Sequence, residues 1–120
     1  MTKILIVDDN KEFCISLADI LEAKGYEVES RNGGQAAIDR VKEKSFDLII
    51  MDIKMPAMNG VEAFKHIKKI NPRTAVIMIT AYALEDLIKE ALAEGAFSVL
   101  RKPFDVDKIL ELIEVIIKKN

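Results

Sequence analysis

The chain has 120 residues, half of them apolar and 32% charged, with a net charge of −2. This length and composition are typical of one globular domain with its own core, and we expect a single domain over residues 1–120. The charge balance excludes bulk attraction to nucleic acid or to an anionic membrane, the apolar runs are too short to span a bilayer, and the single cysteine excludes an internal disulfide.

Short apolar or β-branched segments alternate with amphipathic stretches along the whole chain. The expected strands are residues 3–9, 26–30, 46–52, 74–80 and 97–100. A helix is expected after each strand: the first ends at Gly25, the third begins near Asn59-Gly60 and stops before Asn71, and the fifth has Asp105 as its N-cap. The fourth helix shows five apolar residues at helical spacing, which are Leu84, Leu87, Ile88, Ala91 and Leu92.

This alternation predicts an α/β fold with a doubly wound, five-stranded parallel sheet, a flavodoxin-like (βα)5 arrangement. Residues 3–9, 46–52 and 74–80 are apolar on both faces, so we expect central strands there. Residues 26–30 alternate between apolar and acidic side chains, which is typical of an edge strand. Right-handed crossovers with one reversal predict the strand order 2-1-3-4-5.

Polar residues end four of the expected strands, and ligands of such sheets bind at the carboxyl ends of the strands, where the strand order reverses. The residues at these ends are Asp8, Asp9, Asp52, Thr80, Ala81 and Lys102. Taken singly, each has an ordinary structural explanation, such as Asp9 capping the first helix. Taken together, three carboxylates repel one another unless a cation lies among them, and oxygen ligands suit Mg²⁺ or Mn²⁺. An acidic nucleophile, a metal, a lysine and a hydroxyl donor are what phosphoryl transfer to an aspartate requires.

Four segments carry a resemblance to a known family: ILIVDDN, DLIIMDIKMPAMNG, VIMITAYA and GAFSVLRKPFD. Over essentially its whole length, the chain resembles the receiver domain of two-component response regulators, the chemotaxis-regulator-like fold. The resemblance implies that Asp52 accepts a phosphoryl group from a phosphohistidine on a sensor histidine kinase or a histidine phosphotransfer protein. It also implies that Asp9, Asp52 and the backbone carbonyl of Lys54 bind Mg²⁺, or Mn²⁺ in its place, and that Asp8 helps to hold the metal through water.

The same resemblance assigns three further roles at the site. Lys102 is expected to pair with Asp52 and then with the phosphoryl group. The Lys102–Pro103 peptide bond is expected to be cis. Thr80 is expected to turn toward the phosphoryl oxygen, while Ala81 leaves room and provides a backbone N–H. The resemblance implies that the protein is not an enzyme that turns over a substrate. It is a cytoplasmic phospho-acceptor switch that assists its own phosphorylation and dephosphorylation and signals to an unknown output domain or protein.

The chain departs from the family pattern three residues before Lys102, where Val99 replaces the usual Tyr or Phe. Phe97 is expected at a different strand parity, pointing to the other face of the sheet. We therefore expect Thr80 to move the following loop and helix without an aromatic ring flip. Lys54 and Tyr82, each two residues beyond a key residue, either fill the loops or screen an acyl phosphate from water.

Two surfaces are candidates for partners. Asn10 and Phe13, together with Pro103 and Phe104, border the site and are expected to receive a donor helical bundle. The fifth helix is more apolar than one buried face needs, which indicates either partial burial or a dimer surface built from the fourth helix, fifth strand and fifth helix. The remaining candidates have ordinary readings: His66 as a solvated residue, and Cys14 as a buried, inert thiol.

Two alternatives remain at this stage. A phosphohydrolase of the haloacid-dehalogenase type also uses an aspartate nucleophile, but it needs an acidic residue where this chain has Asn10, two positions after Asp8. A degenerate receiver that binds partners without phosphorylation is disfavoured by the intact key residues. The chain reaches Asn120 soon after the fifth helix, so we expect either a stand-alone regulator or a domain of a larger hybrid kinase or transcription factor.

Overall fold

A computed structural model describes residues 1–119 of the chain, and Asn120, the last residue of the expected domain, lies outside the described residues. The strands are β1 (Lys3–Val7), β2 (Glu27–Arg31), β3 (Leu48–Asp52), β4 (Ala75–Thr80) and β5 (Ser98–Arg101). The helices are α1 (Lys11–Ala23), α2 (Gly34–Glu43), α3 (Gly60–Ile70), α4 (Glu85–Ala93) and α5 (Val106–Lys119).

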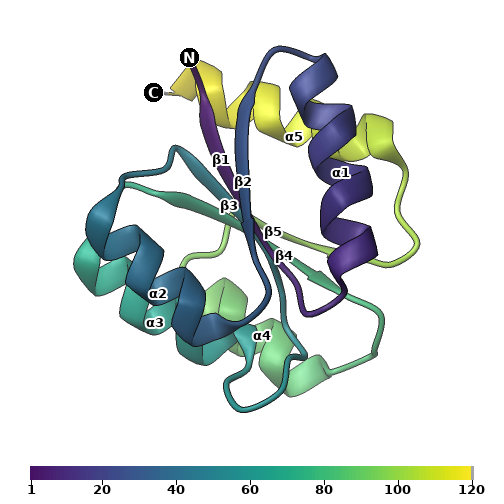
Figure 1. Cartoon of the computed structure of the whole chain (residues 1–120). Coiled ribbons are helices and arrows are strands. Elements are labelled where there is room, and N and C mark those ends of the chain that lie inside the picture. Colours follow the sequence, from purple (N-terminus) through teal and green to yellow (C-terminus); the bar gives the residue numbers. More distant parts are fainter. Residues whose placement is uncertain (120) are drawn as a thin grey trace.

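The five strands form one parallel sheet in the order β2-β1-β3-β4-β5, which confirms the predicted architecture. Helices α1 and α5 cover one face, and α2, α3 and α4 cover the other (Figure 1). Because the order reverses between β1 and β3, the chain leaves the carboxyl ends of these two neighbouring strands toward opposite faces. No helix in the described part of the chain is long and apolar enough to cross a membrane.

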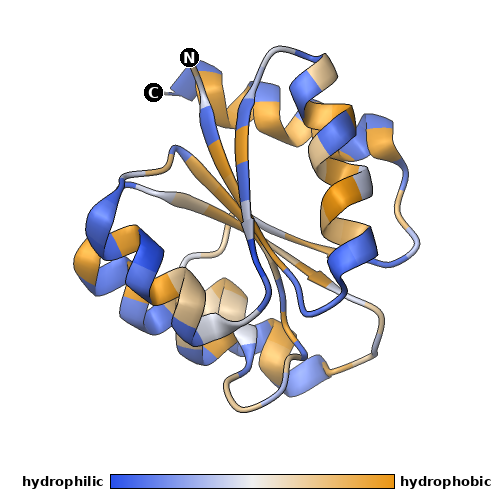
Figure 2. Ribbon diagram, viewed as in Figure 1, coloured by the Kyte–Doolittle hydropathy of each residue, from blue (hydrophilic) through white to orange (hydrophobic). Residues whose placement is uncertain are grey.

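Two apolar layers hold the helices to the sheet, and alternation along each central strand supplies both. On β1, Leu5 and Val7 pack in the layer under α2–α4, whereas Ile4 and Ile6 pack in the layer under α1 and α5. All four side chains are fully buried. Figure 2 shows hydrophobic residues along the central strands and both hydrophobic and hydrophilic residues along the helices.

Helix starts and ends agree with the sequence at most positions, with one correction at the start of α1. Gly25 has a left-handed φ of 94°, as expected after the end of α1, and the Asp105 carboxylate accepts a hydrogen bond from the Asp107 backbone at 2.9 Å. Asp9 does not cap α1: the N-cap is Asn10, whose side chain accepts from the Phe13 backbone at 3.1 Å. This leaves the Asp9 carboxylate free of a capping role.

The apolar face predicted for α4 is only partly correct. Ala91 is the one α4 residue that is fully buried, and Leu92 is 48% exposed. Leu84 precedes the helix as its N-cap and offers no side-chain cap. Helix α4 is therefore the most thinly packed of the helices that cover this face, because α2 and α3 each bury several residues.

Phe97 and Val99 lie on different faces, as expected, but not for the predicted reason. Phe97 packs in the layer under α1 and α5, whereas Val99 packs against the layer under α2–α4. Strand alternation does not explain this, because two residues apart in one strand share a face. The reason is that β5 begins only at Ser98, so Phe97 belongs to the preceding turn.

A close backbone approach fixes the end of β3 against the start of α3. The Gly60 N–H donates to the Ile53 carbonyl at 2.7 Å, and a Cβ at Gly60 would lie 2.3 Å from the Asp52 carbonyl oxygen. Only glycine allows this contact. The capping box of α3, in which Asn59 and Glu62 bond to each other's backbone N–H, holds the helix start in register with the strand end.

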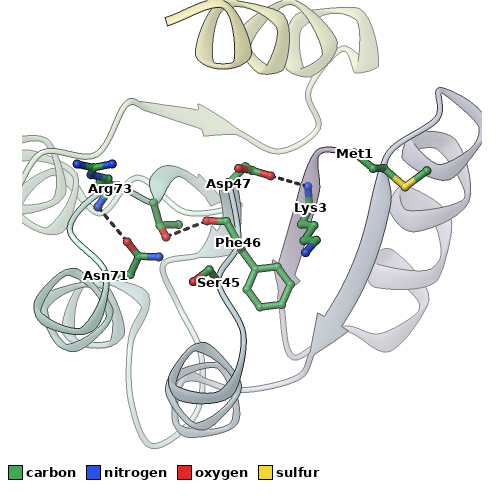
Figure 3. Close-up of a pocket in the computed structure, with 8 residues that line it drawn as sticks. Met1, Lys3, Ser45, Phe46, Asp47, Asn71 and Arg73 are labelled. Atoms are coloured by element: carbon green, nitrogen blue, oxygen red, sulfur yellow. Dashed lines mark hydrogen bonds between the residues drawn. The ribbon is translucent and has the colours of Figure 1, made fainter. Parts of the chain in front are cut away.

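A hollow of about 890 Å³ lies at the opposite edge of the sheet, where β1, β3 and β4 begin (Figure 3). Its polar groups bond to the chain itself: Asp47 accepts from the Lys3 backbone at 2.8 Å, Asn71 from the Arg73 backbone at 3.2 Å, and Thr74 donates to the Phe46 carbonyl at 2.9 Å. These bonds tie neighbouring loops together, which is a structural role.

Candidate functional site

Three carboxylates meet at the carboxyl edge of the sheet. Asp8 and Asp9 directly follow β1, and Asp52 is the last residue of β3. One carboxylate oxygen of each residue lies within 4.8 Å of the other two. Asp8 is fully buried and Asp52 is 7% exposed, whereas Asp9 is exposed to solvent. The strand order thus brings together residues that are more than forty positions apart in the chain, as the sequence predicted.

Bonds to Asp8 fix the turn between β1 and α1. Its carboxylate accepts from the Asn10 backbone at 2.9 Å and from the Lys102 ammonium at 2.6 Å. Its carbonyl accepts from the Asn32 side-chain amide at 3.0 Å and from the Cys14 thiol at 3.5 Å. Cys14 is buried, and burial raises the pKa of its thiol to about 11, which agrees with the expected inert role.

Asp52 is a destabilised carboxylate. Burial, followed by repulsion from Asp8, raises the pKa of Asp52 from 3.8 to about 6. Lys102 and the backbone N–H of Lys54, which lies 3.3 Å from the carboxylate, act in the opposite direction but do not cancel these effects. The ionised form of Asp52 is thus held in a place where a further cation would stabilise it.

Lys102 pairs first with Asp8, which corrects the expected order of its partners. Its ammonium nitrogen is 2.6 Å from the Asp8 carboxylate and 3.7 Å from that of Asp52. The Lys102 backbone N–H donates to the Thr80 carbonyl at 2.8 Å, so β4 fixes the position of the lysine. The Lys102–Pro103 bond is cis, as expected.

Thr80 is fully buried, and its hydroxyl bonds to the backbone of the loop that follows β4. The Thr80 hydroxyl donates a hydrogen bond to the Tyr82 carbonyl and accepts one from the Tyr82 backbone N–H, both at 3.0 Å. Ala81, between these two residues, lines the cavity that contains the carboxylates. The structure therefore brings Ala81 to the site but directs the Thr80 side chain into the loop that precedes α4.

The carboxylates line an open cavity of about 460 Å³, and two exposed residues, Lys54 and Tyr82, line it as well. The Lys54 ammonium lies 4.2 Å from the centre of the Tyr82 ring, a cation–π distance. The two residues come from different loops, after β3 and after β4. This contact joins the loops across one side of the opening.

A second hollow of about 460 Å³, mostly apolar, adjoins the cavity. Phe13, Pro103, Phe104 and Lys102 are among the residues that line it. The rings of Phe13 and Phe104 meet edge to face, with centroids 6.0 Å apart and planes at 90°. The expected docking residues thus lie together at the rim of the site, although the two hollows are distinct.

Sequence reasoning missed three features of this region. The Asn32 side chain bonds to the Asp8 carbonyl across 24 positions, and the turn around Asn32-Gly33 gave no signal of that contact. The Lys102 ammonium lies over the Phe13 ring at 4.1 Å, a contact that only the folded chain reveals. Ile15 on α1 is 62% exposed, and helical periodicity alone could have placed it outside the core. His66 is exposed on α3, as expected.

Comparison with known proteins agrees with this arrangement. The family model described as the response regulator receiver domain matches residues 4–114. The transcriptional regulatory protein ZraR of Klebsiella oxytoca is 44% identical over 106 residues, which are 88% of this chain but 24% of that protein; the chain thus spans about a quarter of that relative. The chemotaxis protein CheY of Bacillus subtilis is 42% identical over 92% of this chain and 93% of its own length.

A solved structure adds the same fold with ligands. The response regulator TrrA of Thermotoga maritima, in complex with Mg²⁺ and BeF, superposes with a TM-score of 0.87 at 29% identity. The match covers 97% of this chain and 99% of that one.

The raised pKa of Asp52 predicts a pH-dependent penalty on stability. A carboxyl whose folded-state pKa is raised stabilises the fold below pH 3.8, and that stabilisation is lost as pH rises through about 6. With metal removed by EDTA, Asp52→Asn should therefore be more stable than wild type by about 1–3 kcal/mol near pH 8, with the difference vanishing toward pH 4. Urea unfolding across this pH range measures it. A variant that is equally or less stable than wild type at pH 8 would contradict the electrostatic account of the site.

Proposed function

Because this chain belongs to the family of response regulator receiver domains, the switch domains of two-component signalling, we propose that Asp52 accepts a phosphoryl group in a Mg²⁺-dependent reaction. The observation that carries the proposal is the meeting of the Asp8, Asp9 and Asp52 carboxylates within 4.8 Å, with the Lys102 ammonium 3.7 Å from Asp52. Family membership also removes the alternative of a haloacid-dehalogenase type phosphohydrolase.

The donor set of the site fits a hard divalent cation. Asp9 and Asp52, with the backbone carbonyl of Lys54, are the proposed direct ligands, and Asp8 is proposed to act through water. Oxygen ligands with this much negative charge suit Mg²⁺, and Mn²⁺ in its place. The raised pKa of Asp52 supports the proposal, because a cation would relieve the repulsion that raises it. When bound, the metal supplies positive charge that offsets the charge on the phosphoryl oxygens.

The transfer itself needs little chemistry from the protein beyond placement. A carboxylate oxygen of Asp52 attacks phosphorus, a new P–O bond forms, and the P–N bond to the donor's imidazole breaks with its electron pair returning to nitrogen. The Lys102 ammonium, already close to Asp52, moves from Asp8 toward the incoming negative charge. The backbone N–H of Ala81 provides a donor to a phosphoryl oxygen, and its small side chain leaves room.

A small donor tests the assignment without any partner protein. Incubation with acetyl phosphate and Mg²⁺ should add the mass of one phosphoryl group to the wild type and to Asp19→Asn, an exposed control on α1. Asp52→Asn should gain nothing, and EDTA should suppress the adduct in the wild type. Absence of an adduct in every sample would indicate a receiver that works without phosphorylation, and an adduct in Asp52→Asn equal to that of the wild type would remove Asp52 as the acceptor.

The apolar hollow beside the site supports a sensor histidine kinase or a histidine phosphotransfer protein as the donor. A donor histidine must approach Asp52 past the rim formed by Phe13, Pro103 and Phe104. Apolar residues at such a rim suit transient docking. Phe104→Asp should weaken transfer from a phosphorylated protein donor while leaving acetyl phosphate as effective as before; equal loss with both donors would contradict this docking surface.

The output switch is proposed to act through Thr80 and α4. The Thr80 hydroxyl now bonds to Tyr82, so its turn toward a phosphoryl group would release the loop before α4. Thin packing of α4 and Val99 in place of an aromatic ring support a loop and helix rearrangement. A phosphoryl mimic that displaces α5 and leaves α4 unmoved would contradict this proposed switch.

The surface formed by α4, β5 and α5, where Val115 is 43% exposed, is a second proposed surface, for dimerisation or output.

Lys54 and Tyr82 are proposed to lengthen the life of the acyl phosphate by screening it from water. Because their contact is exposed, its loss in Lys54→Asn or Tyr82→Ala should speed hydrolysis about two- to fivefold. If the two side chains screen as one unit, the double variant should be no faster than the faster single variant. Decay of the adduct after removal of the donor measures the rate, with Lys69→Asn, an exposed lysine of α3, as the control. Unchanged decay in both single variants would show that these residues only fill the loops.

A further inference from the structure

Three groups surround the Lys102 ammonium, and one of them is an aromatic ring. The nitrogen lies 2.6 Å from the Asp8 carboxylate, 3.7 Å from the Asp52 carboxylate and 4.1 Å from the centre of the Phe13 ring. The lysine side chain is only 20% exposed, so little water competes for the ammonium. At this distance and degree of burial, the ring face attracts the cation.

The position of the Phe13 ring is fixed from two sides. Its backbone N–H donates to the side chain of Asn10, the N-cap of α1, at 3.1 Å. Asn10 directly follows Asp8 and Asp9 in the chain. Its ring packs against the Phe104 ring in a T-shaped contact, with the planes at 90° and the centroids 6.0 Å apart. One short segment, from the end of β1 to the first turn of α1, therefore carries both the carboxylate and the ring that hold Lys102.

A ring face and a carboxylate restrain an ammonium differently. A carboxylate oxygen accepts a directed hydrogen bond, so leaving Asp8 requires that bond to break. Attraction to a ring face depends mainly on distance to the centroid, so the ammonium can turn from one carboxylate to the other while it remains over the ring. A leucine at the same position would fill the space without this attraction.

We propose that Phe13 is a positioning residue for Lys102: its ring keeps the ammonium beside Asp52 while the lysine changes partner from Asp8 to the incoming phosphoryl group. This inference rests on the proposed function. It is separate from docking, because the ring acts on a residue of the same chain and should matter even for a donor too small to contact the rim.

Acetyl phosphate separates the two roles, because it reaches Asp52 without a docking protein. Phe13→Leu should slow adduct formation with acetyl phosphate and Mg²⁺ by about three- to tenfold, the range expected for loss of a partly desolvated cation–π contact. Phe13→Tyr keeps the ring face and should stay within about twofold of wild type. Phe97→Leu is the matched control, because it removes a ring that lies 5.4 Å from a different lysine, Lys119, and it should also stay within about twofold of wild type.

Two further measurements distinguish positioning from general damage. The Mg²⁺ affinity of Phe13→Leu, by isothermal titration, should match that of wild type, because Phe13 holds no metal ligand. In the NMR spectrum of the wild type, the Lys102 methylene protons next to the ammonium should be shifted upfield by the ring, and Phe13→Leu should abolish that shift.

Three outcomes overturn the inference: a Phe13→Leu rate equal to wild type, a Phe97→Leu rate as slow as that of Phe13→Leu, or a loss of Mg²⁺ affinity in Phe13→Leu. An unchanged Phe13→Leu rate would mean that the ring does not position Lys102. An equally slow control would mean that loss of any aromatic packing slows the reaction. A loss of Mg²⁺ affinity would mean that the substitution disturbs the turn after β1. Failure of the proposed function looks different, because wild type itself would then form no adduct. In that case the Lys102 proton shifts still decide whether Phe13 holds the lysine.

Discussion

The central constraint on this molecule is the repulsion between carboxylates that the fold places at one edge of its sheet. Asp8 is fully buried and Asp52 nearly so, and their proximity helps to raise the pKa of Asp52 to about 6. Lys102 is the one cation whose salt bridges, among the described residues, reach these two carboxylates. Its single charge leaves the cluster short of neutrality, which is the electrostatic basis of the divalent cation site and the phosphoryl acceptor that we propose.

The rest of the fold keeps these charges in place. The two apolar layers lock β1 and β3 side by side, so that Asp8 and Asp52 cannot separate to relieve their repulsion. The glycine contact between Gly60 and the Asp52 carbonyl fixes the end of β3 from the other side. Helix α4 and the loop before it are less tightly held, since Ala91 alone is fully buried there. The tightly packed part of the fold therefore positions the carboxylates, and the proposed output rearrangement lies in the loosely packed part.

Much of the fold and of the acidic cluster could be predicted, because both depend on the spacing of apolar and polar residues along the chain. Apolar alternation placed the strands and helices, crossover handedness ordered the strands, and the strand ends identified the acidic cluster with Thr80 and Lys102. What could not be predicted depends on side-chain geometry. Asn10 rather than Asp9 caps α1, because either residue can accept a backbone hydrogen bond and only the folded turn decides between them. The preference of Lys102 for Asp8 and its contact with the Phe13 ring depend on distances that no spacing in the sequence encodes.

The central claim is that one carboxylate of this cluster, and not its neighbours, carries the phosphoryl group. Borohydride reduces an acyl phosphate to an alcohol, so reduction after treatment with acetyl phosphate and Mg²⁺ converts the acceptor aspartate to homoserine. Peptide mass spectrometry then locates the converted residue. The account predicts homoserine at Asp52 alone; conversion of Asp8 or Asp9, or of no aspartate in protein that has gained a phosphoryl group, would contradict it.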